Sequence, residues 1–253
     1  MAPKAIIVTG ASRGIGLAIA NKLLDQSHNL VLVSRSLEEL EGLKKRFPKQ
    51  VVYLAADLTL PDTAAKATQL AIDTFGKLDG VVVNHGVLAP MTRIEHASIE
   101  EWKKLYDANF FSALALAKET IPHLRASKGR IVFVSSGAAL GAYTSWGAYG
   151  SSKAAMNSLA RYIAVEEPEI TTIAISPGRV DTDMQKEIRD QGASVMSEKD
   201  YAGFKSAFEQ GQLNKPEWPA QVIAQLSLEA TPELSGKYVN WNGPELAKYR
   251  RER

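Results

Sequence analysis

The chain has 253 residues, carries 30 basic and 28 acidic side chains, and contains 45% hydrophobic residues. Its formal net charge of +2 gives no electrostatic reason to expect binding to nucleic acid or to a membrane surface. No apolar run approaches the roughly 18 residues that a membrane-spanning helix needs. The absence of cysteine excludes disulfides and thiolate chemistry and favours a reducing compartment. We therefore expect a cytoplasmic protein, and we predict no metal site.

Short apolar segments alternate with longer segments of helical pattern. The predicted strands are Ala5–Val8, Leu30–Ser34, Val51–Ala55, Gly80–Asn84, Arg130–Ser135, Thr171–Ser176 and Tyr238–Trp241. Most are nearly continuous in apolar residues, as expected of parallel strands covered by helices on both faces. The helical patterns are Gly14–Gln26, Leu37–Arg46, Asp62–Phe75, Ala108–Ala126 and Ala148–Glu166. This alternation predicts an α/β fold of one domain, residues 1–253, with a Rossmann-type, doubly wound, mostly parallel seven-stranded sheet.

Residues 182–218 break this alternation. The segment is polar, contains Gly192, Gly203, Gly211 and Pro216, and follows a strand, where open α/β sheets bind their ligands. We interpret it as a mobile lid over a substrate. An ordinary surface insertion is the alternative.

A glycine-rich turn follows the first strand and opens the first helix. Glycine lets a backbone turn tightly and approach a pyrophosphate, whose charge the free amides at the start of the helix would meet. The spacing differs from the G-x-G-x-x-G pattern of the general dinucleotide motif, and a simple tight turn is the alternative. The expected cofactor contacts here are Gly10, Ser12, Arg13, Gly14, Ile15 and Gly16.

The end of the second strand indicates which cofactor is bound. NAD-selective sites place a carboxylate there for the ribose hydroxyls, but Val33–Ser36 contains no acid and holds Arg35. With Arg13, it supplies two permanently charged guanidinium groups, which suit the 2′-phosphate of NADPH; the start of the next helix is the alternative explanation of Arg35. After the third strand, Asp57 and Leu58 are placed to contact the adenine.

Asn84, His85 and Gly86 end the fourth strand at the same edge of the sheet, and we expect them to contact the cofactor. Gly86 would let the chain lie against it. His85 has no carboxylate partner within sequence reach, so we interpret it as a wall residue rather than an acid or base.

A proton-transfer group is predicted in the middle of the chain. Tyr149 and Lys153 stand four residues apart on one predicted helix and share a face. A phenol with a pKa of about 10 is a poor acid at neutral pH, but a neighbouring ammonium group favours the phenolate and lowers that pKa. Tyr149 can then give its proton to a carbonyl oxygen. Ser136, at the end of the fifth strand, can hold the same oxygen.

Together these residues resemble the short-chain dehydrogenase/reductase family over essentially the whole chain. The matches are the glycine turn, Asp57, Asn84–Gly86, Asn109, Ser136, Tyr149, Lys153 and Pro177–Thr182. The resemblance implies that Asn109 kinks its helix and holds a water that links Lys153 to solvent. It also implies cofactor contacts at the nicotinamide end from Asn109, Tyr149, Lys153, Pro177, Gly178, Val180 and Thr182. The family's Asn-Asn-Ala-Gly element is Val83-Asn84-His85-Gly86 here, with imidazole in place of a small residue.

Three stretches resemble the branch that contains the sepiapterin and benzil reductases: Ser145–Tyr149, Val165–Pro168 and Asp181–Gln185. The pterin enzymes anchor the pterin with an acidic residue near the C-terminus, where this chain has Asn240, and an amide offers no charge. We therefore rank a reductase of ketones or benzil-like 1,2-diketones above a pterin reductase. The substrate is expected to touch Ser136, Tyr143, Trp146, Tyr149 and Met184, and plain core packing is the alternative for the three that are not catalytic.

The sequence thus predicts an NADPH-dependent oxidoreductase that reduces a carbonyl by hydride transfer, with Tyr149 as the proton donor. The alternative from another class is a non-catalytic NADPH-binding regulator, since a fold alone does not prove chemistry. A pure binder would not need Asn109, Ser136, Tyr149 and Lys153 together.

Two predicted helices carry small and apolar residues on more than one face, namely Ala108–Ala126 and Ala148–Glu166. A helix lying on a sheet needs only one apolar stripe, so the surplus indicates a second buried surface. In the family these helices pair across a two-fold axis. We therefore expect a homodimer, with a tetramer as the alternative.

Overall fold

The computed structural model describes residues 2–250. The strands of this part form one sheet of seven, in the order β3-β2-β1-β4-β5-β6-β7, and every neighbouring pair is parallel. Their bounds are β1 Ala5–Thr9, β2 Asn29–Ser34, β3 Val51–Ala55, β4 Gly80–Val83, β5 Arg130–Val134, β6 Thr171–Ser176 and β7 Lys237–Asn240. The prediction of a doubly wound sheet is confirmed, and the sheet is wholly rather than mostly parallel.

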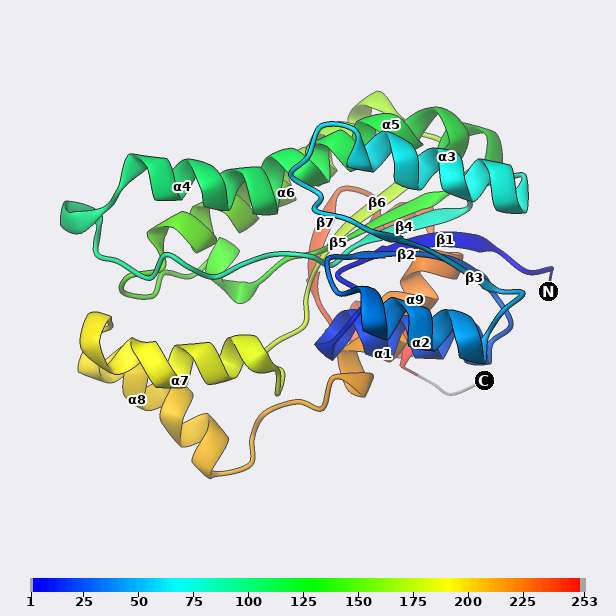
Figure 1. Ribbon diagram of the computed structural model, residues 1–253. Helices are drawn as coiled ribbons and strands as arrows, with labels where there is room; N and C mark the ends of the chain where they lie inside the picture. The colour runs from blue at the N-terminus through cyan, green and yellow to red at the C-terminus, as the bar shows by residue number, and fades with distance from the viewer. Residues whose placement is uncertain (1, 251–253) are drawn as a thin grey trace.

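Helices cover both faces of the sheet (Figure 1). One face carries α1 (Gly14–Asp25), α2 (Leu37–Arg46) and α9 (Glu217–Glu229), and the other carries α3 (Thr63–Phe75), α5 (Ser112–Ser127) and α6 (Gly147–Glu166). The predicted helix Ala108–Ala126 differs at its start, because a π-helical turn over Asp107–Phe111 joins α5 to the preceding α4 (Ile99–Tyr106). That turn contains Asn109.

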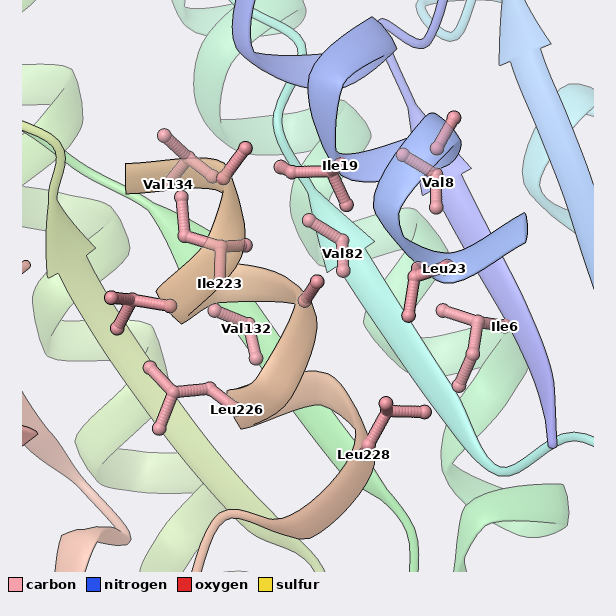
Figure 2. Close-up of a cluster of buried hydrophobic side chains, with 14 of the residues drawn as sticks. Ile6, Val8, Ile19, Leu23, Val82, Val132, Val134, Ile223, Leu226 and Leu228 are labelled. Atoms are coloured by element: carbon pink, nitrogen blue, oxygen red, sulfur yellow. The ribbon is translucent and has the colours of Figure 1, made fainter. Parts of the chain in front are cut away.

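The hydrophobic core explains why the strands are apolar throughout. Ile6 and Val8 of β1 point to the face covered by α1 and α9, where Figure 2 shows them with Ile223 of α9. Ile7, between them, belongs to the cluster on the opposite face. Since successive side chains of a strand point to opposite faces, a sheet covered on both faces needs apolar residues at every position.

The order of the strands in the sheet determines at which edge a ligand would bind. β1 lies between β2 and β4, so the chain crosses to the other side of β1 after β3. Ligands of open α/β sheets bind at the carboxyl ends of the strands where the winding direction reverses. The glycine turn after β1 and the Asn84–Gly86 segment after β4 therefore meet at one point.

The predicted lid forms two helices, α7 (Asp183–Val195) and α8 (Glu198–Glu209), which pack on each other away from the sheet (Figure 1). It ends earlier than predicted, because Glu217 begins α9. A separate apolar cluster, which includes Ile188, Met196 and Phe204, joins it to the segment around Trp146. The mobility of this segment stays a prediction. Within residues 2–250, no helix has the length and apolar character to cross a bilayer.

Candidate active site

A cavity of about 820 Å³ opens at the carboxyl edge of the sheet, and most of the predicted site residues line it. It runs from the glycine turn through the ends of β2 and β3 to the catalytic residues and the lid. The predicted residues that do not line it are Ser12, Gly16 and Asn109. Asn109 is 1% exposed and Ser12 9% exposed, so both residues are buried in the protein.

The glycine turn has no room for side chains. Gly10 and Gly14 have φ values of +63° and +53°, which glycine adopts without strain. A Cβ atom at Gly16 would lie 2.1 Å from the Gly10 carbonyl oxygen. No side chain caps the start of α1, so its first amides are free to meet an anion. The turn therefore fits a pyrophosphate.

The two arginines expected at the 2′-phosphate differ in their surroundings. Arg35 follows β2, lines the cavity and lies near Asp57, whose pKa its charge helps to lower. Arg13 instead donates from Nη1 to Asp183 Oδ2 at 2.8 Å, which links the glycine turn to the first residue of α7. Both partners of this pair are mostly exposed, so it contributes little to stability.

Asp57 lines the cavity and also holds a local turn. Its Oδ1 accepts hydrogen bonds from the backbone amide and the hydroxyl of Thr59, both at 2.8 Å. These bonds hold the pKa of Asp57 below its usual value. The prediction that it accepts from adenine stays untested.

Ser136, Tyr149 and Lys153 converge at the ends of β5 and α6. Lys153 Nζ donates to the carbonyl oxygen of Val134 at 2.8 Å and lies 5.9 Å from the centre of the Tyr149 ring. The Tyr149 hydroxyl interacts with the Ser136 side chain. The three side chains thus face one part of the cavity.

The expected effect of Lys153 on the tyrosine is not found in this structure. Burial raises the pKa of Tyr149, and the hydrogen bond with Ser136 only partly opposes this rise. Burial also lowers the pKa of Lys153 to about 8. Desolvation is the largest cause of both shifts because both side chains lie away from water, at 6% and 3% exposure. Tyr149 therefore holds its proton, and Lys153 can exchange one near neutral pH.

Asn109, in the π-helical turn, forms hydrogen bonds with the backbone of Val87 beside the site. Its Oδ1 accepts from the Val87 amide at 2.8 Å, and its Nδ2 donates to the Val87 carbonyl at 2.9 Å and to Ser152 Oγ at 3.2 Å. A Cβ atom at Gly86 would lie 3.2 Å from Asn109 Oδ1 and 3.3 Å from Lys153 Nζ. Glycine at position 86 thus allows Asn109 and Lys153 to approach each other.

An aromatic wall lies beside Tyr149. The Trp146 ring lies 5.7 Å from that of Tyr149, 5.1 Å from Tyr143 and 5.0 Å from Phe204, measured between centroids. Met184 also lines the cavity, as predicted for a wall residue. Phe204 was not predicted: it comes from α8, far along the chain, and no motif marks it.

The chain matches the short-chain dehydrogenase family model over residues 4–193. It is 38% identical to the benzil reductase ((S)-benzoin forming) of Saccharomyces cerevisiae, over 96% of this chain and 97% of that protein. This chain belongs to the short-chain dehydrogenase family. The crystal structure of a yeast short-chain dehydrogenase/reductase superposes with a TM-score of 0.95 at 40% identity, covering 98% of this chain and 100% of that one. Another yeast structure, described as a cytoplasmic protein of unknown function, superposes with a TM-score of 0.84 at 39% identity. The match covers 98% of this chain and 100% of that one.

Membership makes this chain an oxidoreductase and confirms the resemblance drawn from the glycine turn and the Ser136, Tyr149 and Lys153 set. The family uses a nicotinamide cofactor of the NAD(P) type, and the uncapped helix start and the tight glycine positions of the turn fit one. The choice between NAD and NADP and the identity of the substrate are matters of proposal.

Replacing Lys153 by Met should stabilise the protein at pH 7 by about 2 kcal/mol while removing activity. Below pH 8 both folded and unfolded chains hold the lysine proton, so burial of the charge opposes folding in full. As pH rises from about 8 to 10.5, the folded chain loses this proton first and stability increases. The lost bond to Val134 offsets part of the gain.

Urea unfolding at pH 7 and at pH 9.5 measures this effect. The free energy of unfolding should rise less between the two pH values in the Lys153→Met variant than in the wild type. Lys118→Met, at a side chain 79% exposed, is the control and should change little at either pH. A Lys153→Met variant less stable than the wild type at pH 7 would contradict the assigned desolvation.

Proposed function

We propose that this protein is an NADPH-dependent reductase of ketones or benzil-like 1,2-diketones. The observation that carries the proposal is one cavity in which the phosphate-binding turn, the Ser136 and Tyr149 pair and an aromatic wall are continuous. The benzil reductase of yeast, at 38% identity over nearly the whole chain, supports the same choice of substrate.

The cofactor end supports NADPH over NADH. β2 ends in Ser34, and the residue that follows is Arg35, so no carboxylate stands where the ribose hydroxyls of NADH would bind. Arg35 has a planar, permanently charged group at the cavity, which suits a phosphate. Arg13 has further donors besides the Nη1 that bonds Asp183. When bound, NADPH would supply the hydride.

Residues of this chain would transfer the proton to the substrate. Ser136 orients the carbonyl oxygen of the substrate, and Tyr149, which keeps its proton at neutral pH, donates it to that oxygen. Lys153, whose pKa burial lowers to about 8, can then return a proton to the tyrosine. Asn109 holds the Val87 backbone beside this group, and the water relay that the family resemblance implies is part of the proposal.

The wall of the substrate pocket favours aromatic carbonyl compounds. The ring centroids of Tyr143, Trp146 and Phe204 lie within 5.3 Å of one another. Met184, whose flexible thioether adapts to the shape of a ligand, lines the same cavity. A pterin reductase is the second candidate, but Asn240 is exposed and does not line the cavity, so it offers no anchor for a pterin. A non-catalytic regulator is disfavoured because binding alone does not require the Ser136, Tyr149 and Lys153 set.

We also infer a homodimer, with a tetramer as the alternative, and a cytoplasmic location. Large apolar side chains stay exposed beside α5 and on α6, among them Phe111, Tyr162 and Val165. Such a surface indicates a partner, and a two-fold pairing of like surfaces is the commonest one. The related yeast structure described as cytoplasmic supports the location. No binding to nucleic acid or membrane is proposed.

The experiment that tests the function is a screen of NADPH oxidation against benzil, phenylglyoxal, isatin, diacetyl and sepiapterin. The proposal expects the aryl diketones to be reduced fastest. Reduction of sepiapterin alone would support the pterin reductase, and tight NADPH binding without any turnover would support the regulator.

Tyr149→Phe should remove nearly all turnover and leave NADPH affinity within a few fold of the wild type. The change deletes the proton donor and keeps the ring that packs against Trp146. Steady-state kinetics with the best substrate and fluorescence titration with NADPH measure both effects. More than a tenth of the wild-type kcat would remove Tyr149 from its role.

Arg35→Asp should shift the preference from NADPH toward NADH. The carboxylate repels the 2′-phosphate and offers the ribose hydroxyls an acceptor, so kcat/KM should fall for one cofactor and rise for the other. Lys22→Asp, on the outer side of α1 and away from this cavity, is the charge-matched control. An unchanged ratio of the two values would show that the phosphate is bound elsewhere.

Light scattering at micromolar concentration should give at least twice the mass of one 27.5 kDa chain. Tyr162→Glu and Val165→Glu together should shift the mass toward one chain, because they bury charge at the inferred contact. A wild-type mass near that of one chain would refute the dimer.

A further inference from the structure

His85 is a half-buried titratable side chain that the proposed mechanism does not use. It lies between the cofactor turn and the proton-transfer group and lines the cavity. Both ring nitrogens have close partners: Nδ1 lies 2.7 Å from Thr9 Oγ1, and Nε2 lies 2.8 Å from Ser112 Oγ.

The partners of the two hydroxyls define the protonation of the ring. Ser112 Oγ donates its single proton to the Ala108 carbonyl at 2.8 Å, so it must accept from His85 Nε2. Nε2 therefore carries a proton. Removal from water lowers the pKa of His85 to about 3, and the positive charge of Lys153 acts in the same direction, so the ring is neutral and Nδ1 is unprotonated. The Thr9 hydroxyl has two acceptors within reach, the Val82 carbonyl at 3.1 Å and His85 Nδ1 at 2.7 Å, and the shorter contact takes its single proton.

This chain of bonds connects the two halves of the site. Thr9 ends β1 directly before Gly10, and its Oγ1 also accepts from the Asn84 amide. Ser112 ends the π-helical turn, since its amide bonds the Asp107 carbonyl five residues earlier. The path from Thr9 through His85 to Ser112 thus spans from the cofactor turn to the turn that holds Asn109.

We propose that His85 is a positioning residue that, as the neutral Nε2–H tautomer, fixes the distance between the cofactor turn and the π-helical turn carrying Asn109. The proposal rests on the proposed reductase function for its kinetic effect. Asn84 also holds the cofactor turn, because its Nδ2 donates to the carbonyls of Thr9 and Gly10. Loss of His85 should therefore affect proton transfer more than cofactor affinity.

Two single variants break the chain of bonds from either side. His85→Phe keeps a ring without nitrogen atoms, and Ser112→Ala removes the acceptor of Nε2. Each should lower kcat by about tenfold and change the Kd for NADPH by less than about threefold. The double variant should be no worse than either single one, because both remove the same interaction. His85→Gln, which restores a donor and an acceptor, should recover most of the lost kcat.

Thr120→Val is the matched control for Ser112→Ala. Thr120 lies on the same helix, is fully buried, and its hydroxyl bonds only carbonyls of its own helix, those of Leu116 and Ala117. This control should keep kcat within about twofold. If Ser112→Ala behaves like Thr120→Val while His85→Phe loses activity, the effect of His85 is packing, and the proposal fails. Additive losses in the double variant would also overturn it.

A spectroscopic measurement tests the protonation state of His85 without an activity assay. In nitrogen-15 spectra of the full chain, His85 should show the neutral Nε2–H pattern from pH 8 down to pH 5, and Ser112→Ala should shift that signal. A ring that titrates near pH 6.5, or a signal that Ser112→Ala leaves in place, would overturn the assignment. If the wild type reduces no carbonyl, the proposed function fails, and these spectra still decide the role of His85.

Discussion

The functional site depends on one steric contact, between the glycine turn and the chain that follows β4. A Cβ atom at Gly10 would lie 3.1 Å from His85 Cα and 3.2 Å from the His85 amide nitrogen, so these backbones touch with no side chain between them. The contact exists because β1 and β4 are parallel neighbours, which requires the chain to cross over after β3. The order of the sheet, the turn and the cavity are therefore parts of one arrangement, in which His85, just after β4, has a fixed distance to span between Thr9 and Ser112.

Burial sets the electrostatics of the catalytic group. Lys153 and Tyr149 lie on one helix and lose contact with water together, so desolvation lowers the pKa of the amine and raises that of the phenol. Both shifts favour the neutral form of each group. A tyrosine that keeps its proton is suited to donate it to a carbonyl oxygen, and an amine with a pKa of about 8 is suited to supply the replacement. The arrangement therefore suits the proposed reductase, and burial of the Lys153 charge opposes folding.

The sequence predicted what depends on local pattern. Runs such as Thr171–Ser176 and Val51–Ala55 matched their strands, and the spacing of Tyr149 and Lys153 placed both on one helix face. It did not predict what depends on distant contacts. The π-helical turn at Asn109 has helical composition, Phe204 reaches the site through the packing of α8, and the pairing of Arg13 with Asp183 joins positions 170 apart. The lowered pKa expected for Tyr149 is not found in this structure, because proximity to a cation can be inferred from spacing, whereas burial cannot.

The lid and the cofactor turn are connected directly rather than through the substrate pocket. A Cβ atom at Gly14 would lie 3.2 Å from Thr182 Cγ2, and the next residue, Asp183, pairs with Arg13 of the same turn. On its other side the lid packs Phe204 against Trp146, which in turn contacts the Tyr149 ring. The two helices of the lid thus contact the glycine turn directly and the Tyr149 ring through Trp146. Because these contacts come from one short segment, a shift of α7 and α8 would change the cofactor end and the substrate wall together.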